Sequence, residues 1–149
     1  MKIEKLIDLS KKKKKLAVGL MSGTSLDAVD AVLIEIQKSG IKTRTNQLGF
    51  ITYPFPAGLK KKLLENSSIN SSNVTDICRL NFLIALVYTD AVKLLCKKSM
   101  IPLDKIDLIG SHGQTIHHLP PKEKAVPPVV EETVTAASRH ILDFVIMDI

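Results

Sequence analysis

The chain has 149 residues, of which 45% are apolar and 24% charged, a composition typical of a globular protein with one hydrophobic core. Aromatic residues make up only 4% and tryptophan is absent, so the stacking platforms that bind single-stranded nucleic acid are not expected. Five of the positive charges behind the net charge of +6 lie in the run Lys11–Lys15, which we interpret as a solvated arm.

The sequence predicts a cytoplasmic protein without a membrane partner or a specific nucleic-acid partner. No apolar run reaches the roughly 18 residues of a transmembrane helix, and the N-terminus lacks the apolar segment of a secretory signal. Cys78 and Cys96 have no metal-ligand spacing. We expect both to be buried thiols of one helix in a reducing compartment.

The first part of the chain predicts three consecutive strands. Residues 1–15 form a charged extension with at most one frayed helical turn. Apolar runs then predict strands at Leu16–Met21, Asp27–Gln37 and Thr43–Pro54. Because turn-forming residues separate these runs, we expect an antiparallel meander.

Two helices are predicted next. Ala57–Glu65 is a short amphipathic segment, and it is followed by a loop rich in Asn and Ser. Val74–Lys98 repeats apolar side chains every three or four positions, which predicts a long helix. Asn73 or Thr75 is the expected N-cap of this helix.

The remaining sequence predicts a strand, a helix and a strand. The first strand is expected at Leu103–Ile109, after the helix-breaking Pro102. A weaker helical pattern covers Val129–His140, and the apolar stretch Ile141–Ile149 is strand-like.

The order β-β-β-α-α-β-α-β predicts an α/β fold in which helix-linked strands extend three antiparallel ones into a mixed sheet with flanking helices. This order resembles the ribonuclease-H-like core of the actin, Hsp70 and hexokinase superfamily. In that superfamily the turn between the first two strands holds the phosphates of ATP. We expect residues 16–149 to form one such lobe.

The turn after the first strand is the first candidate site. Ser22–Ser25 brings a glycine, hydroxyl groups and backbone N–H groups to one point, and converging N–H groups can bind an anion. A polar hairpin that binds nothing is the alternative. Asp27 could orient Thr24 or Ser25, act through a metal-bound water, or cap the turn, whereas a structural role is favoured for Asp30.

The second candidate site is the loop Gly110–His118, read as G-S-H-G-Q-T-I-H-H, which directly follows a predicted strand. Ligands of mixed α/β sheets bind at such carboxyl ends of strands. His112 and Gln114 have the hydrogen-bonding groups that a polyhydroxylated ligand needs, and Gly110 and Gly113 permit close approach. The histidine spacing does not match a usual zinc site.

Both motifs together resemble those of the anhydro-N-acetylmuramic acid kinase family. Met21–Leu33, read as M-S-G-T-S-L-D-A-V-D-A-V-L, and Gly110–His118 carry the resemblance, which extends over about Leu16–Leu119. It implies an ATP- and Mg²⁺-dependent sugar kinase of cell-wall recycling. Such an enzyme opens the 1,6-anhydro ring of anhydro-N-acetylmuramic acid with water and phosphorylates the freed 6-hydroxyl.

The resemblance also implies two sets of site residues. The ATP-binding turn would consist of Gly23, Thr24, Ser25, Leu26, Asp27, Ala28, Val29 and Asp30. His112, Gly113, Gln114 and Thr115 would face the amino sugar. Ala28 stands where the family usually has glycine, and an alanine would be strained there if the position required a positive φ.

The resemblance implies that members of this family are more than twice as long as this chain. It also implies that the catalytic base lies in the part of the family sequence that follows the resemblance. We therefore expect no catalytic residue here and interpret the chain as an N-terminal fragment, inactive alone. Its exposed apolar surface would favour a homodimer. The alternative is a non-catalytic nucleotide- or sugar-binding module that keeps the fold.

Overall fold

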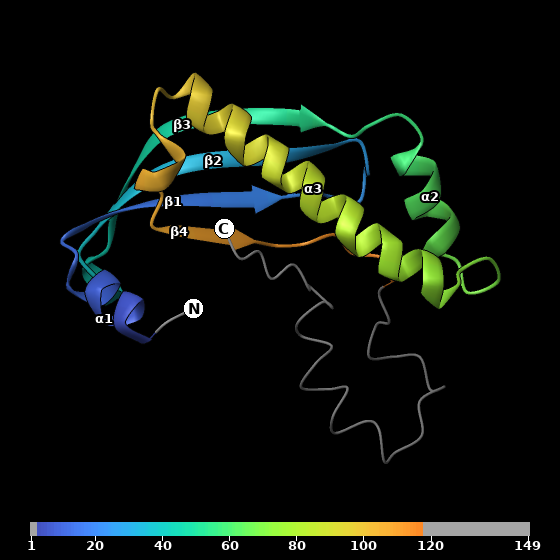
Figure 1. Cartoon of the computed structure of the whole chain (residues 1–149), viewed down its shortest axis with the longest axis horizontal. Coiled ribbons are helices and arrows are strands. Elements are labelled where there is room, and N and C mark those ends of the chain that lie inside the picture. Colours follow the sequence, from blue (N-terminus) through green and yellow to red (C-terminus); the bar gives the residue numbers. More distant parts are fainter. Residues whose placement is uncertain (1–2, 118–149) are drawn as a thin grey trace, which may run out of the picture.

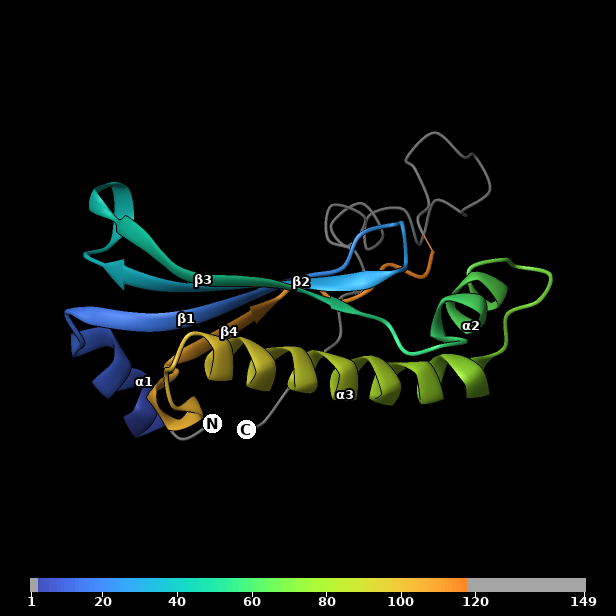
Figure 2. The same cartoon turned by 90° about the horizontal axis from the view of Figure 1, so that it is seen from above.

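A computed structural model describes residues 3–117; the helix expected at 129–140 and the strand expected at 141–149 lie outside the described residues. A twisted sheet forms the centre, and one long helix crosses one of its faces (Figure 1 and Figure 2). The helices and strands are α1 (Ile3–Lys11), β1 (Lys14–Met21), β2 (Ala28–Gln37), β3 (Arg44–Pro54), α2 (Leu59–Asn66), α3 (Val74–Lys98) and β4 (Leu108–Ser111). Two short 3₁₀ turns, η1 (Gly40–Lys42) and η2 (Leu103–Lys105), complete the list.

The strand order in the sheet is β3-β2-β1-β4. β1 pairs antiparallel with β2, and β2 pairs antiparallel with β3. β4 pairs parallel with β1, from Ala17 opposite Leu108 to Leu20 opposite Ser111. A parallel pair needs a long crossover, which α3 provides. The predicted α/β fold with a mixed sheet is thus confirmed.

The core lies between the sheet and α3. Alternation along β2 places Val29, Ala31 and Leu33 on the face beneath α3, each fully buried. Tyr88 and Leu95 of α3 are equally buried against them. The apolar face of α3 therefore packs on the apolar face that alternation creates on β2. This packing fixes the register of the sheet.

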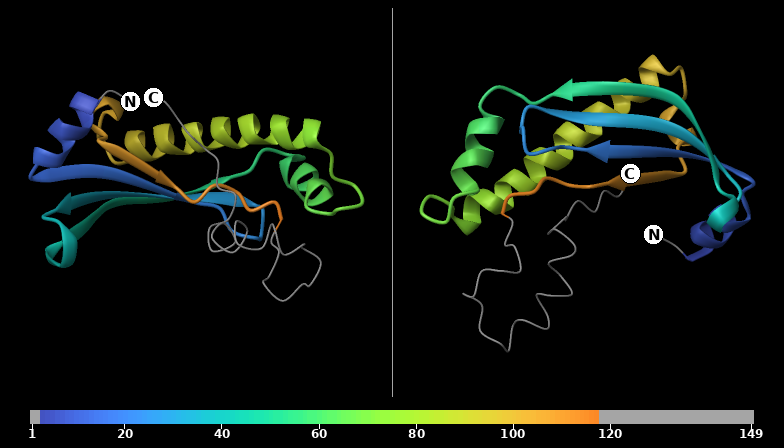
Figure 3. Two further views of the ribbon diagram at one scale, coloured as in Figure 1. Left: turned by 90° about the horizontal axis from the view of Figure 1, so that it is seen from below. Right: turned by 180° about the vertical axis from the view of Figure 1, so that it is seen from behind.

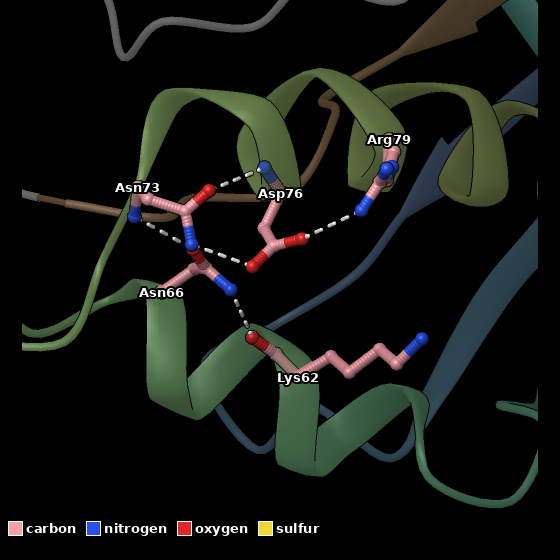
Figure 4. Close-up of polar contacts among 5 residues, drawn as sticks. All are labelled: Lys62, Asn66, Asn73, Asp76 and Arg79. Carbon is pink, nitrogen blue, oxygen red and sulfur yellow. Dashed lines mark hydrogen bonds and ion pairs between the residues drawn. The ribbon is translucent and has the colours of Figure 1, made fainter.

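The connection between α2 and α3 is held by side-chain amides (Figure 4). Asn73 is the N-cap of α3, because its Oδ1 accepts a hydrogen bond from Asp76 N (2.9 Å). Its own backbone N donates to Oδ1 of the buried Asn66 (3.2 Å), whose Nδ2 donates to the Lys62 carbonyl (3.0 Å). Arg79 pairs with Asp76 at 3.5 Å. Of the two expected caps, Asn73 is the correct one.

Three expectations about local structure are wrong. Residues 3–11 form a nine-residue helix instead of one frayed turn. The strand expected from Leu103 begins only at Leu108, because residues 103–105 form η2 and the Asp107 backbone N donates to the Leu16 carbonyl (2.8 Å), where pairing with β1 begins. Cys78 does lie in α3 with Cys96, but its side chain is exposed and only Cys96 is buried.

Over residues 3–117, no helix is both long and apolar enough to cross a membrane. The longest of the described helices, α3, has 25 residues, and its exposed positions include apolar residues such as Phe82 (71%) and Leu86 (62%) as well as charged ones.

Candidate functional site

The first candidate loop is a tight turn between β1 and β2. Its backbone closes through a hydrogen bond from Leu26 N to Gly23 O (3.3 Å). Thr24 and Ser25, the two central residues, both have negative φ, whereas Leu26 has a φ of 53°. These angles exclude the type II, I′ and II′ turns and leave the type I arrangement. The left-handed residue of the turn is therefore a leucine.

Two buried side chains fix this turn to the body of the protein. Ser22 is 2% exposed and its Oγ donates to Gln114 Oε1 (2.7 Å), with the Ala28 carbonyl as a second acceptor at 3.0 Å. Leu26 is 6% exposed and belongs to the hydrophobic core. The residues between them are consequently held in place from both sides.

Gly23, Thr24 and Ser25 face solvent. Within the described part of the chain, their backbone N–H groups donate to no protein acceptor. Backbone donors that are exposed, clustered and held rigidly are suited to binding an anion. The turn thus presents unpaired backbone donors to solvent, and anion binding by them stays a prediction.

The two aspartates of the turn differ in their surroundings. The Ser25 hydroxyl donates to Asp27 Oδ1 (2.6 Å), and this hydrogen bond, helped by the nearby Lys60, lowers the pKa of the exposed Asp27 carboxyl. Asp30 lies in β2, where its Oδ1 accepts from the Thr52 hydroxyl of β3 (2.7 Å). Asp30 therefore has the structural contact that the sequence favoured, while Asp27 remains accessible.

Ala28 opens β2 opposite Pro54 and is not among the residues with positive φ. An L-residue fits an extended backbone without strain. The alanine in place of the family's usual glycine is thus compatible with this turn.

The second candidate loop follows β4 and lies beside the turn, because β1 and β4 are parallel and end at the same edge of the sheet. His112 N donates to the Leu20 carbonyl (3.0 Å). Gln114 is 8% exposed and bonded to Ser22, and Gly113 has a φ of 72°. Loops separated by some 90 residues are thereby joined directly.

Tyr88 of α3 supports this loop from the core. Its hydroxyl donates to the Gly113 carbonyl at 2.7 Å, in a buried position. The sequence predicts no such role for Tyr88, although a tyrosine on the apolar face of a helix indicates a supporting contact, since a buried phenol needs a hydrogen-bond partner.

His112 is the unusual residue of the second loop. Its Nδ1 is buried and has no hydrogen-bond partner among the described residues. Thr115, three residues further along the loop, is half-buried. His117 is exposed, and its Nδ1 lies 3.4 Å from the Ser67 carbonyl oxygen. Over residues 3–117, no group of three or more His, Cys, Asp or Glu side chains is arranged to hold a metal ion.

A sequence model of the anhydro-N-acetylmuramic acid kinase family matches residues 15–145. The chain belongs to this family. It is 47% identical over 105 residues to the anhydro-N-acetylmuramic acid kinase of Bacillus cereus (strain G9842), a match that covers 70% of this chain and 28% of the relative. The kinase of the same name from Bacillus thuringiensis subsp. konkukian (strain 97-27) is 45% identical over 106 residues, or 71% of this chain and 28% of the relative.

The match to the anhydro-N-acetylmuramic acid kinase family includes both candidate loops, and it begins after α1. The matched region spans only 28% of the length of these curated relatives. Residues 15–145, which the family model matches, include the pairing region of β1 and β4.

The left-handed leucine of this turn gives a prediction about stability. Leu26→Ala removes a buried side chain and keeps a strained backbone, whereas Leu26→Gly removes slightly more volume but relieves the positive φ, which costs an L-residue about 1–2 kcal/mol. We expect both variants to be destabilised, with Leu26→Gly the more stable of the two by about 1 kcal/mol. Urea denaturation measures the difference, and a more stable alanine variant would contradict the assigned backbone.

Proposed function

We propose that this chain supplies the ATP-phosphate turn and the sugar-side loop of an ATP-dependent anhydro-N-acetylmuramic acid kinase. The reaction opens the 1,6-anhydro ring of the amino sugar with water and transfers a phosphoryl group to its 6-hydroxyl. The observation that supports this proposal is the buried hydrogen bond between Ser22 and Gln114, because it joins the two loops of the family motif at one edge of the sheet.

The proposed phosphate-binding residues are Gly23, Thr24, Ser25, Leu26, Asp27, Ala28, Val29 and Asp30. Among them, the exposed N–H groups of Gly23, Thr24 and Ser25 have the donor chemistry that phosphate oxygens need. Leu26 and Val29 are buried and position the turn, and Asp30 joins β2 to β3.

The position of Asp27 beside the turn favours binding of the phosphate together with Mg²⁺. Its hydrogen bond from Ser25 lowers the pKa of the carboxyl, so at neutral pH the group is ionised and repels a bare phosphate. Carboxylate and phosphate oxygens are together the usual ligands of Mg²⁺, often through water. Bound ATP–Mg²⁺ supplies the transferable phosphoryl group and neutralises its developing charge.

The proposed sugar-binding residues are His112, Gly113, Gln114 and Thr115. A buried ring nitrogen without a partner is costly, and a sugar hydroxyl or acetamido group would satisfy Nδ1 of His112. Ser22 fixes the side-chain amide of Gln114, while Tyr88 fixes the backbone at Gly113. The loop would therefore meet its ligand already in position.

We propose no catalytic base among the described residues. A base that activates water works best with a pKa near the operating pH, and the lowered pKa of Asp27 makes this carboxylate a weak one. In this proposal the 149-residue chain binds its ligands but does not by itself catalyse phosphoryl transfer.

Calorimetric titration tests this proposal with ATP–Mg²⁺, with ATP plus a chelator, and with anhydro-N-acetylmuramic acid. We expect binding of ATP that Mg²⁺ strengthens, and a smaller Mg²⁺ effect in Asp27→Asn. Asp104→Asn, an exposed aspartate in η2, is the matched control and should leave the Mg²⁺ effect unchanged. If neither ATP nor the sugar bound, the proposal would be refuted. Formation of phosphorylated product by the chain alone would refute the statement that it lacks a catalytic base.

A chimera separates the kinase from the non-catalytic alternative. The chain is fused to the unmatched remainder of the Bacillus cereus relative and assayed with both substrates. Phosphoryl transfer is the expected result. Ligand binding without transfer, in a chimera that unfolds cooperatively, would favour the binding module instead.

A further inference from the structure

The positive charge of the described chain is concentrated at one end. We define the lysine end as residues 7–15, 35–44 and 97–107, which comprise the junction of α1 with β1, the connection of β2 with β3, and the end of α3 with η2. These segments lie together in Figure 1, at the end of the sheet away from α2. They contain eleven Lys and Arg and four Asp and Glu, a net charge of +7. The rest of residues 7–117 holds five of each, a net charge of zero.

Most lysines of this end are available to a partner. Lys12 and Lys14 pair with Asp107 (2.6 Å) and Glu35 (3.3 Å), yet their side chains stay 53% and 64% exposed. Lys11 and Lys13 are exposed and form no ion pair with any described residue. Because the acids at this end are few and mostly paired, its charge is not neutralised within the described chain.

The helix α1 adds an apolar component beside these lysines. Apolar residues recur in the sequence of α1 at helical spacing. Ile7 is 47% exposed, and Figure 2 shows α1 beside the starting end of β1, clear of α3. A basic segment next to a short amphipathic helix is the pattern of peripheral membrane binding.

Nucleic acid fits this surface less well. Single-stranded nucleic acid is bound by basic grooves with aromatic stacking residues, and the lysine end contains no Phe, Tyr or Trp. The family match begins at residue 15, so α1 and four of the five lysines of the run lie outside it, whereas the segments 35–44 and 97–107 lie inside it. The candidate site lies at the opposite end of β1 (Figure 3).

We propose that the lysine end binds the surface of membranes that contain acidic lipids, with α1 in the headgroup region and the candidate site facing water. The sequence predicts no membrane partner because no apolar run is long enough for a transmembrane helix, but peripheral binding requires no such run. The proposal is independent of the kinase function.

Vesicle sedimentation with the full chain tests this proposal. Vesicles of phosphatidylcholine, with and without phosphatidylglycerol, are compared at about 0.1 M and about 1 M NaCl, a change that shortens the Debye length from about 10 Å to about 3 Å. We expect binding only with phosphatidylglycerol, and its loss at high salt. The double variant Lys11→Glu/Lys13→Glu should bind at least about tenfold more weakly.

The double variant Lys60→Glu/Lys62→Glu is the matched control, because it changes the net charge equally on exposed lysines of α2. It should bind like the unaltered chain, and Ile7→Ser should reduce binding further than the control. Equal losses in both double variants, equal binding to both vesicle types, or no vesicle binding would overturn the proposal. Binding of polyuridylate without binding of acidic vesicles would overturn it in favour of nucleic acid.

Discussion

Replacing Leu33 with alanine is expected to lower the free energy of unfolding by about 3–5 kcal/mol. Leu33 lies in the middle of β2, fully buried, opposite Val18 of β1 and Gly49 of β3. Its side chain belongs to the core beneath α3, so a smaller residue leaves a cavity that sheet and helix have little freedom to fill. Urea denaturation followed by circular dichroism measures the loss.

Ile41→Ala is the matched control for Leu33. Ile41 lies in η1 and is fully exposed, so its truncation should change the free energy of unfolding by less than about 0.5 kcal/mol. Similar effects of the two truncations would show that the described core does not hold the sheet together.

Thr24→Pro is expected to weaken the binding of ATP–Mg²⁺ by about tenfold or more while leaving the fold intact. Thr24 is the second residue of the type I turn from Gly23 to Leu26, the position at which proline is favoured. Its N–H bonds to no described residue, so proline removes a donor that only a ligand uses. A hydrogen bond to a charged group contributes about 1.5–3 kcal/mol, which gives the size of the loss.

Thr24→Ala serves as the comparison, because it removes the same hydroxyl but keeps the N–H. The difference in affinity between the two variants, measured by calorimetry, isolates the backbone donor. Denaturation midpoints should agree closely between them. If the proline variant bound ATP–Mg²⁺ as tightly as the alanine variant, the turn would not bind phosphate through its amide groups.

The sequence predicted the strands and long helix because their patterns are local. Apolar alternation around Val29, Ala31 and Leu33 and the spacing of α3 each require only neighbouring residues. Asn73 was found as a cap for the same reason, since its acceptor group lies next to the first turn of the helix. The mixed sheet followed from the order of these elements along the chain.

The sequence did not predict features that depend on contacts between distant residues. The start of β4 depends on Asp107 meeting Leu16, and the support of Gly113 depends on Tyr88. The positive φ of Leu26 arises because burial in the core outweighs the backbone preference of a leucine. Cys78 was expected to be buried, but it lies on the solvent side of α3. The site residues themselves were proposed from the family motif, and ligand binding by them is still a prediction.

The pairing of β1 with β4 has a consequence for the order of folding. The turn at Gly23 is closed by strands adjacent in sequence, whereas the loop at His112 reaches its place only when Ser111 pairs with Leu20, more than 90 positions away. Contacts at such separation form slowly, since a long segment must be ordered first. We expect a nascent hairpin to present the turn at Gly23 early, with the loop at His112 joining it only in the rate-limiting step.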